Sequence, residues 1–200
     1  IRGKRLRENE IKSIVRDVVE RHLSDVELAS FVTALYTRGL SMNETEVLSK
    51  AMVETGKTLN LNKSPILDKH SIGGMPGDKT SILIVPIIAA AGFIIPKTSS
   101  RAITSPAGTA DRVETLCPVN LTIEEILNVV NKTNGCMVWG GALELAPADD
   151  LFIQVEYPLG IDPLLLPSIM SKKKAIGATH LVIDIPTGRG VKIKTIGEAH

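Results

Sequence analysis

The chain has 200 residues, of which 44% are hydrophobic, so it can bury a core and form one large domain or two small ones. Its formal net charge is +1, from 23 basic and 22 acidic residues, which argues against the electrostatic attraction that nucleic-acid binding needs. Three Phe, two Tyr and one Trp are too few for a platform that stacks single strands, so the composition favours small-molecule chemistry.

Residues 1–56 predict three amphipathic helices. Capping boxes of the form Ser-x-x-Glu, at Ser24 and at Ser41, mark the starts of the second and third helices. Glycines stand where both of these helices are expected to end, at Gly39 and Gly56. Apolar residues recur at helical spacing in the first helix, at Ile11, Ile14, Val15, Val18 and Val19.

From Ser64 onward the sequence changes character, because Pro and Gly become frequent and β-branched runs appear at Ile94–Ile95 and at 181–185. Helices are predicted at 78–91, at 122–132 and at 148–157, and the stretch 149–177 is helical in pattern as a whole. Strands that alternate with helices indicate an α/β unit with a mostly parallel sheet.

Two cysteines, Cys117 and Cys136, have neither metal-ligand spacing nor the density of a secreted scaffold, so we expect buried thiols in a reducing compartment. The apolar run 82–91 is too short to span a bilayer and contains Pro86, and no signal-peptide pattern precedes it. A cytoplasmic location is therefore expected.

The segment 69–81 combines a cation, hydroxyl groups and the glycines Gly73, Gly74 and Gly77 directly before a predicted helix. Glycines let backbone N–H groups approach an anion, and the helix N-terminus and Lys69 add positive potential. The segment matches neither the ATP-binding P-loop nor the dinucleotide fingerprint. It predicts an oxyanion site, with an ordinary tight turn before a helix as the alternative.

A second polar cluster, at 97–109, follows a strand-like segment. Six hydroxyl side chains and Arg101 fall within 98–109, where they could surround phosphate oxygens. A solvated Ser/Thr-rich loop is the alternative. Two such clusters at strand–helix junctions favour a shared crevice.

These segments, Lys69-His-Ser-Ile-Gly-Gly-Met-Pro-Gly-Asp-Lys, Thr98-Ser-Ser-Arg-Ala-Ile-Thr-Ser and Gly108-Thr-Ala-Asp, resemble the thymidine and pyrimidine-nucleoside phosphorylase family. The similarity is closer to its archaeal branch, which acts on nucleoside 5′-monophosphates, and it extends over essentially the whole chain. The resemblance implies that the inorganic-phosphate ligands are Lys69, Ser71, Ser81, Ser99 and Thr109. It implies nucleotide contacts at Gly74, Ser100, Arg101, Ala102, Ile103, Thr104, Ser105, Thr109, Ser168, Lys172 and Lys192.

The resemblance also indicates which residues would contact the nucleobase and which residue would act as the proton donor. The base-contacting Arg of the pyrimidine enzymes aligns with Gly160, so that contact is missing. Asp162 takes the place of the proposed proton donor, which a desolvated site would keep protonated; the alternative is a plain Asp-Pro turn. His70 matches a histidine proposed to act on the base, with a backbone-bonded loop histidine as the alternative. Between Asp162 and Ser168 the sequence is shorter and less polar than the branch pattern.

The implied reaction is phosphorolysis of AMP, and also of CMP or UMP, to the free base and ribose 1,5-bisphosphate. Phosphate would attack C1′ through an oxocarbenium-like transition state, as in glycoside hydrolysis. Phosphate is a co-substrate, and we expect no cofactor, no metal, no nucleic acid and no membrane. Arg101 with the hydroxyls of 100–105 is expected to hold the 5′-phosphate.

Pattern and resemblance together predict an α/β fold class, with a small all-helical domain, a larger α/β domain with a mostly parallel, mixed sheet, and an active site in the cleft between them. The helical domain is expected at 1–65 and 149–179, and the α/β domain at 66–148 and 180–200. The chain is expected to be a fragment of a longer protein. Relatives dimerise through the helical domain, so a homo-oligomer is expected.

Three other functions fit parts of the pattern: a thymidine or pyrimidine nucleoside phosphorylase, a magnesium-dependent phosphoribosyltransferase of the anthranilate type, and a non-catalytic nucleotide-binding module. Magnesium dependence separates the transferase from a phosphorylase. Nucleotide binding without base release would identify the module.

Overall fold

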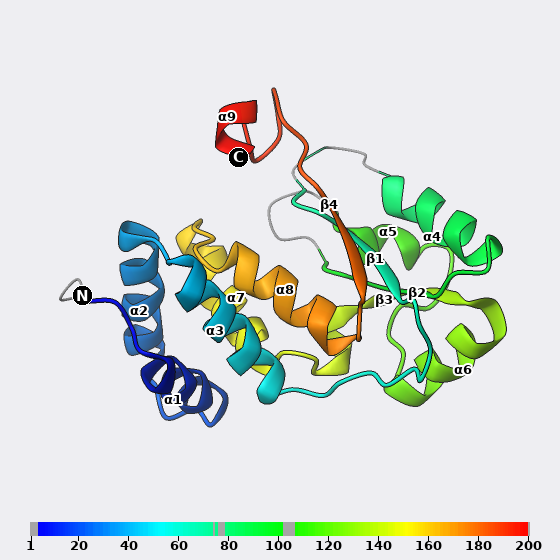
Figure 1. Ribbon diagram of the computed structural model, residues 1–200. Coiled ribbons are helices and arrows are strands. Elements are labelled where there is room, and N and C mark those ends of the chain that lie inside the picture. The colour runs from blue at the N-terminus through cyan, green and yellow to red at the C-terminus, as the bar shows by residue number, and fades with distance from the viewer. Residues whose placement is uncertain (1–3, 74, 76–78, 102–106, 200) are drawn as a thin grey trace. The chain divides into compact units, whose positions relative to one another are not determined.

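The computed structural model describes residues 4–73, 75, 79–101 and 107–199. Within them the chain forms two compact units, each built from two segments (Figure 1). The first unit consists of Ile1–Thr58 and Glu144–Ala175, and the second of Leu59–Leu143 and Ile176–His200. The combination of a helical unit and an α/β unit with parallel strands confirms the predicted fold class.

The first unit is entirely helical (Figure 1, blue to cyan and yellow to orange). Its helices pack around one apolar cluster that includes Val15, Val32, Met52 and Phe152. The predicted capping boxes are confirmed, since the Ser24 and Ser41 hydroxyls accept from the backbone N–H groups of Glu27 and Glu44 at 3.4 and 3.2 Å. The helices are α1 (Glu8–Val19), α2 (Asp25–Arg38), α3 (Met42–Glu54), α7 (Pro147–Leu159) and α8 (Leu165–Ala175).

Glu44 fixes the start of α3 from a buried position, with 3% of its surface exposed. Its carboxylate accepts the backbone N–H groups of Ser41 and Leu6 at 2.9 and 2.8 Å and pairs with Arg5 at 2.7 Å. Burial by itself would raise the pKa of this carboxyl, but the donors outweigh it and lower the pKa to about 2. The charged carboxylate therefore ties residues 5 and 6, which precede α1, to α3.

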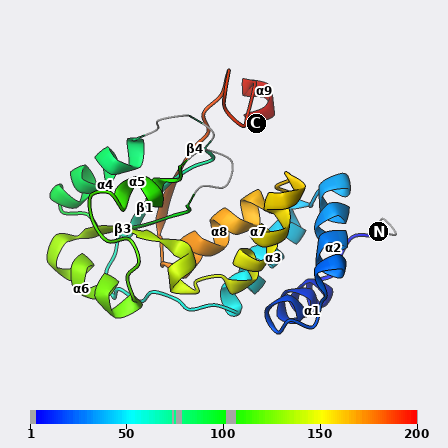
Figure 2. The ribbon, with the colours of Figure 1, turned by 180° about the vertical axis from the view of Figure 1, so that it is seen from behind.

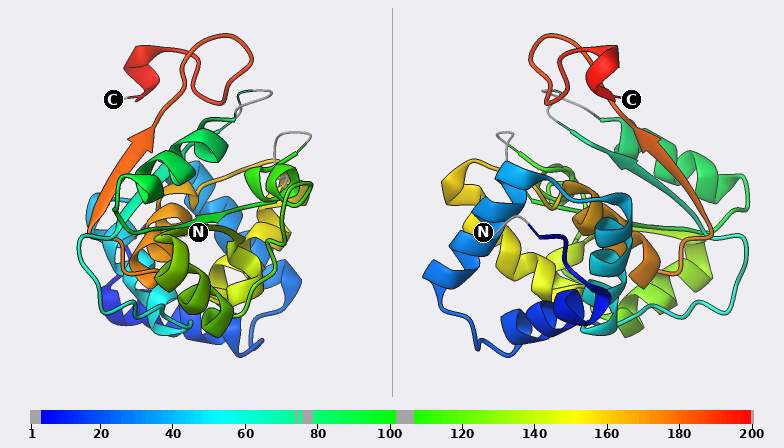
Figure 3. Two further views of the ribbon diagram at one scale, coloured as in Figure 1. Left: turned by 90° about the vertical axis from the view of Figure 1, so that its right-hand side faces the viewer. Right: turned by 60° about the vertical axis from the view of Figure 1, so that its left-hand side comes forward.

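The described part of the second unit has four strands, which pair in parallel, and β1, β3 and β4 are labelled in Figure 2. β1 pairs with β4, drawn as the orange arrow in Figure 3, and β2 pairs with β3. A bridge between Ile66 and Ile94, with the Leu67 N–H donating to the Ile94 carbonyl at 2.8 Å, joins the two pairs in the order β4, β1, β2, β3. The elements are β1 (Leu67–Ser71), α4 (Thr80–Ala90), β2 (Ile95–Ser99), α5 (Thr109–Val113), α6 (Ile123–Thr133), β3 (Gly135–Trp139), β4 (His180–Asp184) and α9 (Ile196–Ala199), with a 3-10 turn η1 (Gly140–Leu143).

The boundaries of the two units differ from the sequence-based ones at 65, 148 and 179. Residues 144–148 join the helical unit because Ala146 and Ala148 belong to its apolar cluster. Residues 176–179 join the α/β unit because the Thr179 hydroxyl accepts the Ile66 N–H at 2.9 Å. Hydrogen bonds and core contacts therefore set these boundaries.

The predicted helices at 78–91, 122–132 and 148–157 correspond to α4, α6 and α7. Strands β1 and β3 were not predicted, because β1 contains no β-branched side chain and β3 contains only Val138. Among the described residues, no helix combines the length and the apolar character that crossing a membrane would require.

Candidate phosphate and nucleotide site

The carboxyl ends of β1 and β2 bring the described first residues of the two predicted polar clusters to one edge of the α/β unit. β1 ends at Ser71 and β2 ends at Ser99. In the parallel register Ser71 lies opposite Asp184, and Ser99 lies opposite Trp139. In open parallel sheets this edge is where ligands bind, so Ser71 and Ser99 lie where a ligand is expected.

Lys69 is a buried cation near this edge, with 5% of its surface exposed. Its Nζ lies 3.0 Å from Oδ2 of Asp184, whose side chain is 37% exposed. The Oγ atom of Ser71, two residues further along β1, is buried and has no hydrogen-bond partner among the described atoms. A buried hydroxyl without a partner is costly in a protein interior, so this edge is suited to an incoming anion.

The other predicted phosphate ligands lie at the strand ends and the helix starts of the same unit. Ser81 is buried in the first turn of α4, and Thr109 is the first residue of α5. Ser99 is half-buried, and its hydroxyl donates to the Val138 carbonyl at 3.4 Å. Hydroxyl groups at these positions offer neutral donors, whereas Lys69 offers charge.

Gly108 brings the end of β2 and the start of α5 into close contact. A Cβ atom at this position would lie 2.4 Å from the Ser100 carbonyl oxygen and 2.5 Å from the Arg101 carbonyl carbon. The glycine has an extended backbone, with φ −75°, so close approach and not a left-handed conformation requires it. The Ala110 N–H donates to the Ser100 carbonyl at 3.2 Å and closes this contact.

Arg101 is held by acidic and aromatic side chains of its own unit. Its guanidinium contacts Glu114 at 2.6 and 2.8 Å and Asp111 at 3.0 Å, and lies 4.8 Å from the centre of the Trp139 ring. The hydrogen bonds with Glu114 and then Asp111 raise the pKa of Arg101. In this conformation the guanidinium fork is already occupied by a carboxylate, so a 5′-phosphate would have to compete with Glu114 for it.

Several predicted nucleotide contacts lie outside the described residues, namely Gly74, Ala102, Ile103, Thr104 and Ser105. Ser100 is exposed at the end of β2, and Lys192 is half-buried in the segment that follows β4. His70 is half-buried on β1, where it lies opposite Ile183.

In the helical unit, Ser168 and Lys172 lie on one face of α8, four residues apart. Both contact the same oxygen of Asp149, which belongs to the first turn of α7 and is fully buried. The Ser168 hydroxyl donates to Oδ2 of Asp149 at 3.0 Å, and the Lys172 Nζ lies 2.5 Å from it. The sequence pattern did not indicate a role for Asp149, because acidic residues are common near the start of a helix.

Two further carboxyl groups of the helical unit bear on the choice of acid. Asp162, the predicted proton donor, is exposed between α7 and α8. Asp150, on α7, has a pKa raised to about 6, mainly by burial. No sequence pattern indicated a perturbed pKa at Asp150, since its burial depends on the fold.

Gly160 ends α7 in the left-handed conformation, with φ +66°, and its N–H donates to the Tyr157 carbonyl at 3.2 Å. Glycine is the residue that adopts this conformation most readily. An arginine at this position, as in the pyrimidine enzymes, would be strained on this backbone.

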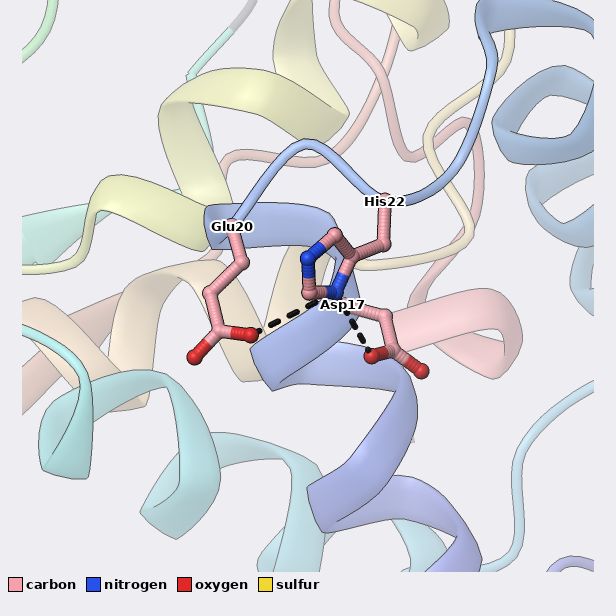
Figure 4. A group of neighbouring side chains, drawn as sticks. All are labelled: Asp17, Glu20 and His22. Atoms are coloured by element: carbon pink, nitrogen blue, oxygen red, sulfur yellow. Dashed lines mark hydrogen bonds and ion pairs between the residues drawn. The ribbon is translucent and has the colours of Figure 1, made fainter.

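One group of side chains in the described part of the chain is close enough to share a metal ion: Asp17, in the last turn of α1, with Glu20 and His22 directly after this helix (Figure 4). The His22 Nδ1 lies 3.4 Å from a carboxylate oxygen of Asp17 and 3.4 Å from one of Glu20. The imidazole and the carboxylates therefore contact each other directly. Glu20 and His22 are exposed, and nothing else at this position indicates a ligand.

Comparison with known families now defines the class of protein. A model described as the helical bundle domain of a glycosyl transferase family matches residues 1–56. A model described as the a/b domain of a glycosyl transferase family matches residues 63–199, well over half of the chain. The chain therefore belongs to the glycosyl transferase family that these helical-bundle and a/b domains define.

Individual relatives are similar to this chain over nearly its whole length. A protein of Thermofilum pendens described as AMP phosphorylase is 61% identical over 199 residues, which cover 100% of this chain and 39% of the relative. Proteins described in the same way are 58% identical in Thermococcus kodakarensis and in Methanocaldococcus jannaschii, over 98% of this chain and 40% and 39% of the relatives. The chain thus spans about two fifths of the length of these curated relatives.

A solved structure shares the fold. Anthranilate phosphoribosyltransferase from Thermus thermophilus superposes with a TM-score of 0.79 at 26% identity, covering 92% of this chain and 56% of that chain. The combination of a helical bundle and an α/β domain is thus shared with this transferase.

Proposed function

We propose that this chain supplies the phosphate- and nucleotide-binding part of a phosphorylase that converts AMP and phosphate to adenine and ribose 1,5-bisphosphate. CMP and UMP are further candidate substrates. Relatives named AMP phosphorylase, 58–61% identical over nearly the whole chain, support the substrate class. Inorganic phosphate is the co-substrate in this proposal, and no cofactor takes part.

The observation that carries the proposal is the buried polar edge of the parallel strands. Lys69 places a cation there and Ser71 an unsatisfied hydroxyl, while Ser99 ends the neighbouring strand. A phosphate bound by these groups would have its charge neutralised and its oxygens positioned for in-line attack. Since the transition state resembles an oxocarbenium ion, an anion held beneath C1′ also stabilises the developing positive charge.

The nucleotide would be held by the helical unit's Ser168 and Lys172 together with residues 100–105 and Lys192. In this proposal Asp162 donates a proton to the leaving base, and His70 is a second candidate for a role at the base. Protonation of the base lowers the barrier to breaking the N-glycosidic bond. Oligomer formation through the helical domain is part of the same proposal, and light scattering measures it directly.

Base release tests the proposed function. The longest polypeptide that contains this sequence is incubated with AMP, CMP, UMP, adenosine or thymidine, with and without phosphate, and free base is measured. Adenine release from AMP that requires phosphate, with little release from adenosine, is the expected result. Release from thymidine would make the protein a nucleoside phosphorylase, and AMP binding without release would make it a binding module.

Lys69→Met is the informative variant in this assay. It removes the buried cation while its partner Asp184 remains partly exposed to water. We expect the KM for phosphate to rise by at least about tenfold, because a charge-assisted contact to the anion is lost. The matched control is Lys57→Met, which breaks an exposed Lys–Glu pair in the helical unit and should leave both KM values unchanged.

A further inference from the structure

The buried carboxylate of Asp149 lies behind two of the predicted nucleotide ligands. It is fully buried in the first turn of α7, whereas Ser168 and Lys172 come from α8. One of its oxygens, Oδ2, accepts the Ser168 hydroxyl at 3.0 Å and contacts the Lys172 Nζ at 2.5 Å. A single atom thus fixes the position of both side chains.

We propose that Asp149 is the positioning residue of the nucleotide site: it orients the Ser168 hydroxyl and keeps Lys172 charged, so that both can bind the nucleotide. This inference rests on the proposed function, which assigns nucleotide contacts to Ser168 and Lys172. Asp149 itself is too deeply buried to touch a substrate.

The geometry restricts both partners. Residues four apart on a helix project from the same face, so a carboxylate opposite that face can reach both side chains. The Ser168 hydroxyl, which would otherwise rotate freely, has its proton directed at Asp149 and its lone pairs directed away from it. Lys172, with 18% of its side chain exposed, has its flexible stem held at the end by an ion pair.

The charge of Lys172 depends on its acidic neighbours. Burial alone would lower the pKa of this lysine, but Asp149, and then Asp150 and Glu156, outweigh burial and raise it. Asp149 makes the direct contact, and the other two act over a longer range. Removing the charge at residue 149 should therefore make Lys172 a weaker base.

Stability alone does not explain this arrangement. The second oxygen of Asp149, Oδ1, is buried and has no hydrogen-bond partner among the described atoms. A buried carboxylate with an unsatisfied oxygen is expensive, and well-packed apolar residues often replace buried ion pairs without loss of stability. A role in holding Lys172 charged and in place accounts for a carboxylate at this position.

Asp149→Asn keeps the size of the side chain and removes its charge. In the longest polypeptide that contains this sequence, we expect the KM for AMP to rise by at least about tenfold and the KM for phosphate to stay within about twofold. A fall in kcat with both KM values unchanged, as a smaller folded fraction produces, would overturn the proposal. Glu46→Gln is the matched control, since it breaks an exposed carboxylate–lysine pair of similar length, 2.6 Å, in the same unit.

The reactivity of Lys172 provides a readout that needs no substrate. Its rate of acetylation at increasing pH, followed by mass spectrometry of the peptide, should shift to lower pH in Asp149→Asn because the amine loses its proton more easily. Asp149→Glu should keep Lys172 protonated but misplace it, so the KM for AMP rises without a shift in reactivity. If wild-type protein releases no adenine, the proposed function fails, and the acetylation profile still decides the role of Asp149; an unchanged profile in Asp149→Asn overturns it.

A comparison in a background that lacks both partners of Asp149 covers the case in which Asp149→Asn does not fold. Ser168→Ala with Lys172→Gln removes the hydroxyl and the amine that Asp149 contacts, and Asp149→Asn is then added to this background. If Asp149 acts through these two side chains, the two proteins should share nearly the same KM for AMP. A further large increase when Asp149→Asn is added would contradict the proposal.

Discussion

Two buried carboxylates of this chain are each held by more than one donor. Glu44 accepts two backbone N–H groups and an arginine, and Asp149 accepts a hydroxyl and a lysine. Glu44 has a structural explanation, because it ties the segment before α1 to the start of α3. Lys69 and Asp149 have no structural explanation that is equally complete. Ser71 Oγ, two residues from Lys69, and the Oδ1 atom of Asp149 have no hydrogen-bond partner among the described atoms. Such groups are typical of ligand sites.

Asp150 gives a pH-dependent prediction. Its pKa is about 6 in the folded chain against an ordinary value of 3.8, so the folded state keeps a proton that the unfolded chain releases. Stability contributed by this group is therefore present at low pH and is lost as the pH rises through about 6. We expect Asp150→Asn to stabilise the protein at pH 8 relative to pH 5, by about 1 kcal/mol after allowance for partial solvent screening.

The measurement is urea unfolding of wild type and Asp150→Asn at these two pH values. Asp25→Asn is the control, because it changes an exposed carboxylate of the same unit. Equal effects of Asp150→Asn at both pH values would show that Asp150 does not hold its proton in the folded state.

At the scale of elements, backbone contacts join the residues directly after β2 to the start of α5. Gly108 allows the chain to pass the carbonyls of Ser100 and Arg101, and its N–H donates to the Asp111 carboxylate at 2.8 Å. The same aspartate binds the Arg101 guanidinium. Ser99 and Thr109 flank this connection, so its geometry determines how far apart two predicted phosphate ligands lie.

Gly108→Ala is expected to disturb this connection. The added methyl group would meet backbone atoms at 2.4–2.7 Å, which side-chain rotation cannot relieve. We expect a loss of stability of about 1–3 kcal/mol, as for overpacked sites, and a KM for phosphate raised by at least about tenfold. Gly197→Ala is the control, since its Cβ would meet its nearest atom at 3.9 Å. Thermal unfolding and phosphate kinetics measure both effects, and a variant equal to wild type would contradict the close contact.

At the scale of the molecule, the predicted ligands divide between two compact units. Lys69, Ser71, Ser81, Ser99 and Thr109 belong to the α/β unit, whereas Asp162, Ser168 and Lys172 belong to the helical unit. Phosphate binding can therefore be examined separately from nucleotide binding. The α/β unit should respond to inorganic phosphate alone.

Phosphate is expected to stabilise the protein against unfolding when it binds only the folded state. At a concentration of 100 times the Kd the gain is about 2.7 kcal/mol. Differential scanning calorimetry in phosphate and in chloride of equal ionic strength should show a higher Tm in phosphate for wild type. Lys69→Met should remove most of this difference and Lys57→Met should not. An undiminished shift in Lys69→Met would mean that the anion binds elsewhere.

Local patterns in the sequence were sufficient for the helices and for the class of fold. Capping boxes at Ser24 and Ser41 predicted helix starts that the structure confirms, because these interactions involve residues three apart. Alternating helices and β-branched runs predicted a parallel α/β unit for the same local reason. The two polar segments that predicted phosphate chemistry could also be recognised from the sequence, since the glycines and hydroxyl-bearing residues of each segment lie close together along the chain.

Only the tertiary structure decided which distant residues meet. The pairing of Lys69 with Asp184, of Asp149 with Lys172, and the burial of Asp150 depend on contacts between segments far apart or on packing that no local pattern encodes. The engagement of Arg101 by Glu114 and Trp139 is of the same kind. The sequence by itself thus determined the helices, the α/β class and the polar segments, because short-range spacing controls them. The fold decided which charges are buried and paired, because solvent exclusion depends on the packed chain as a whole.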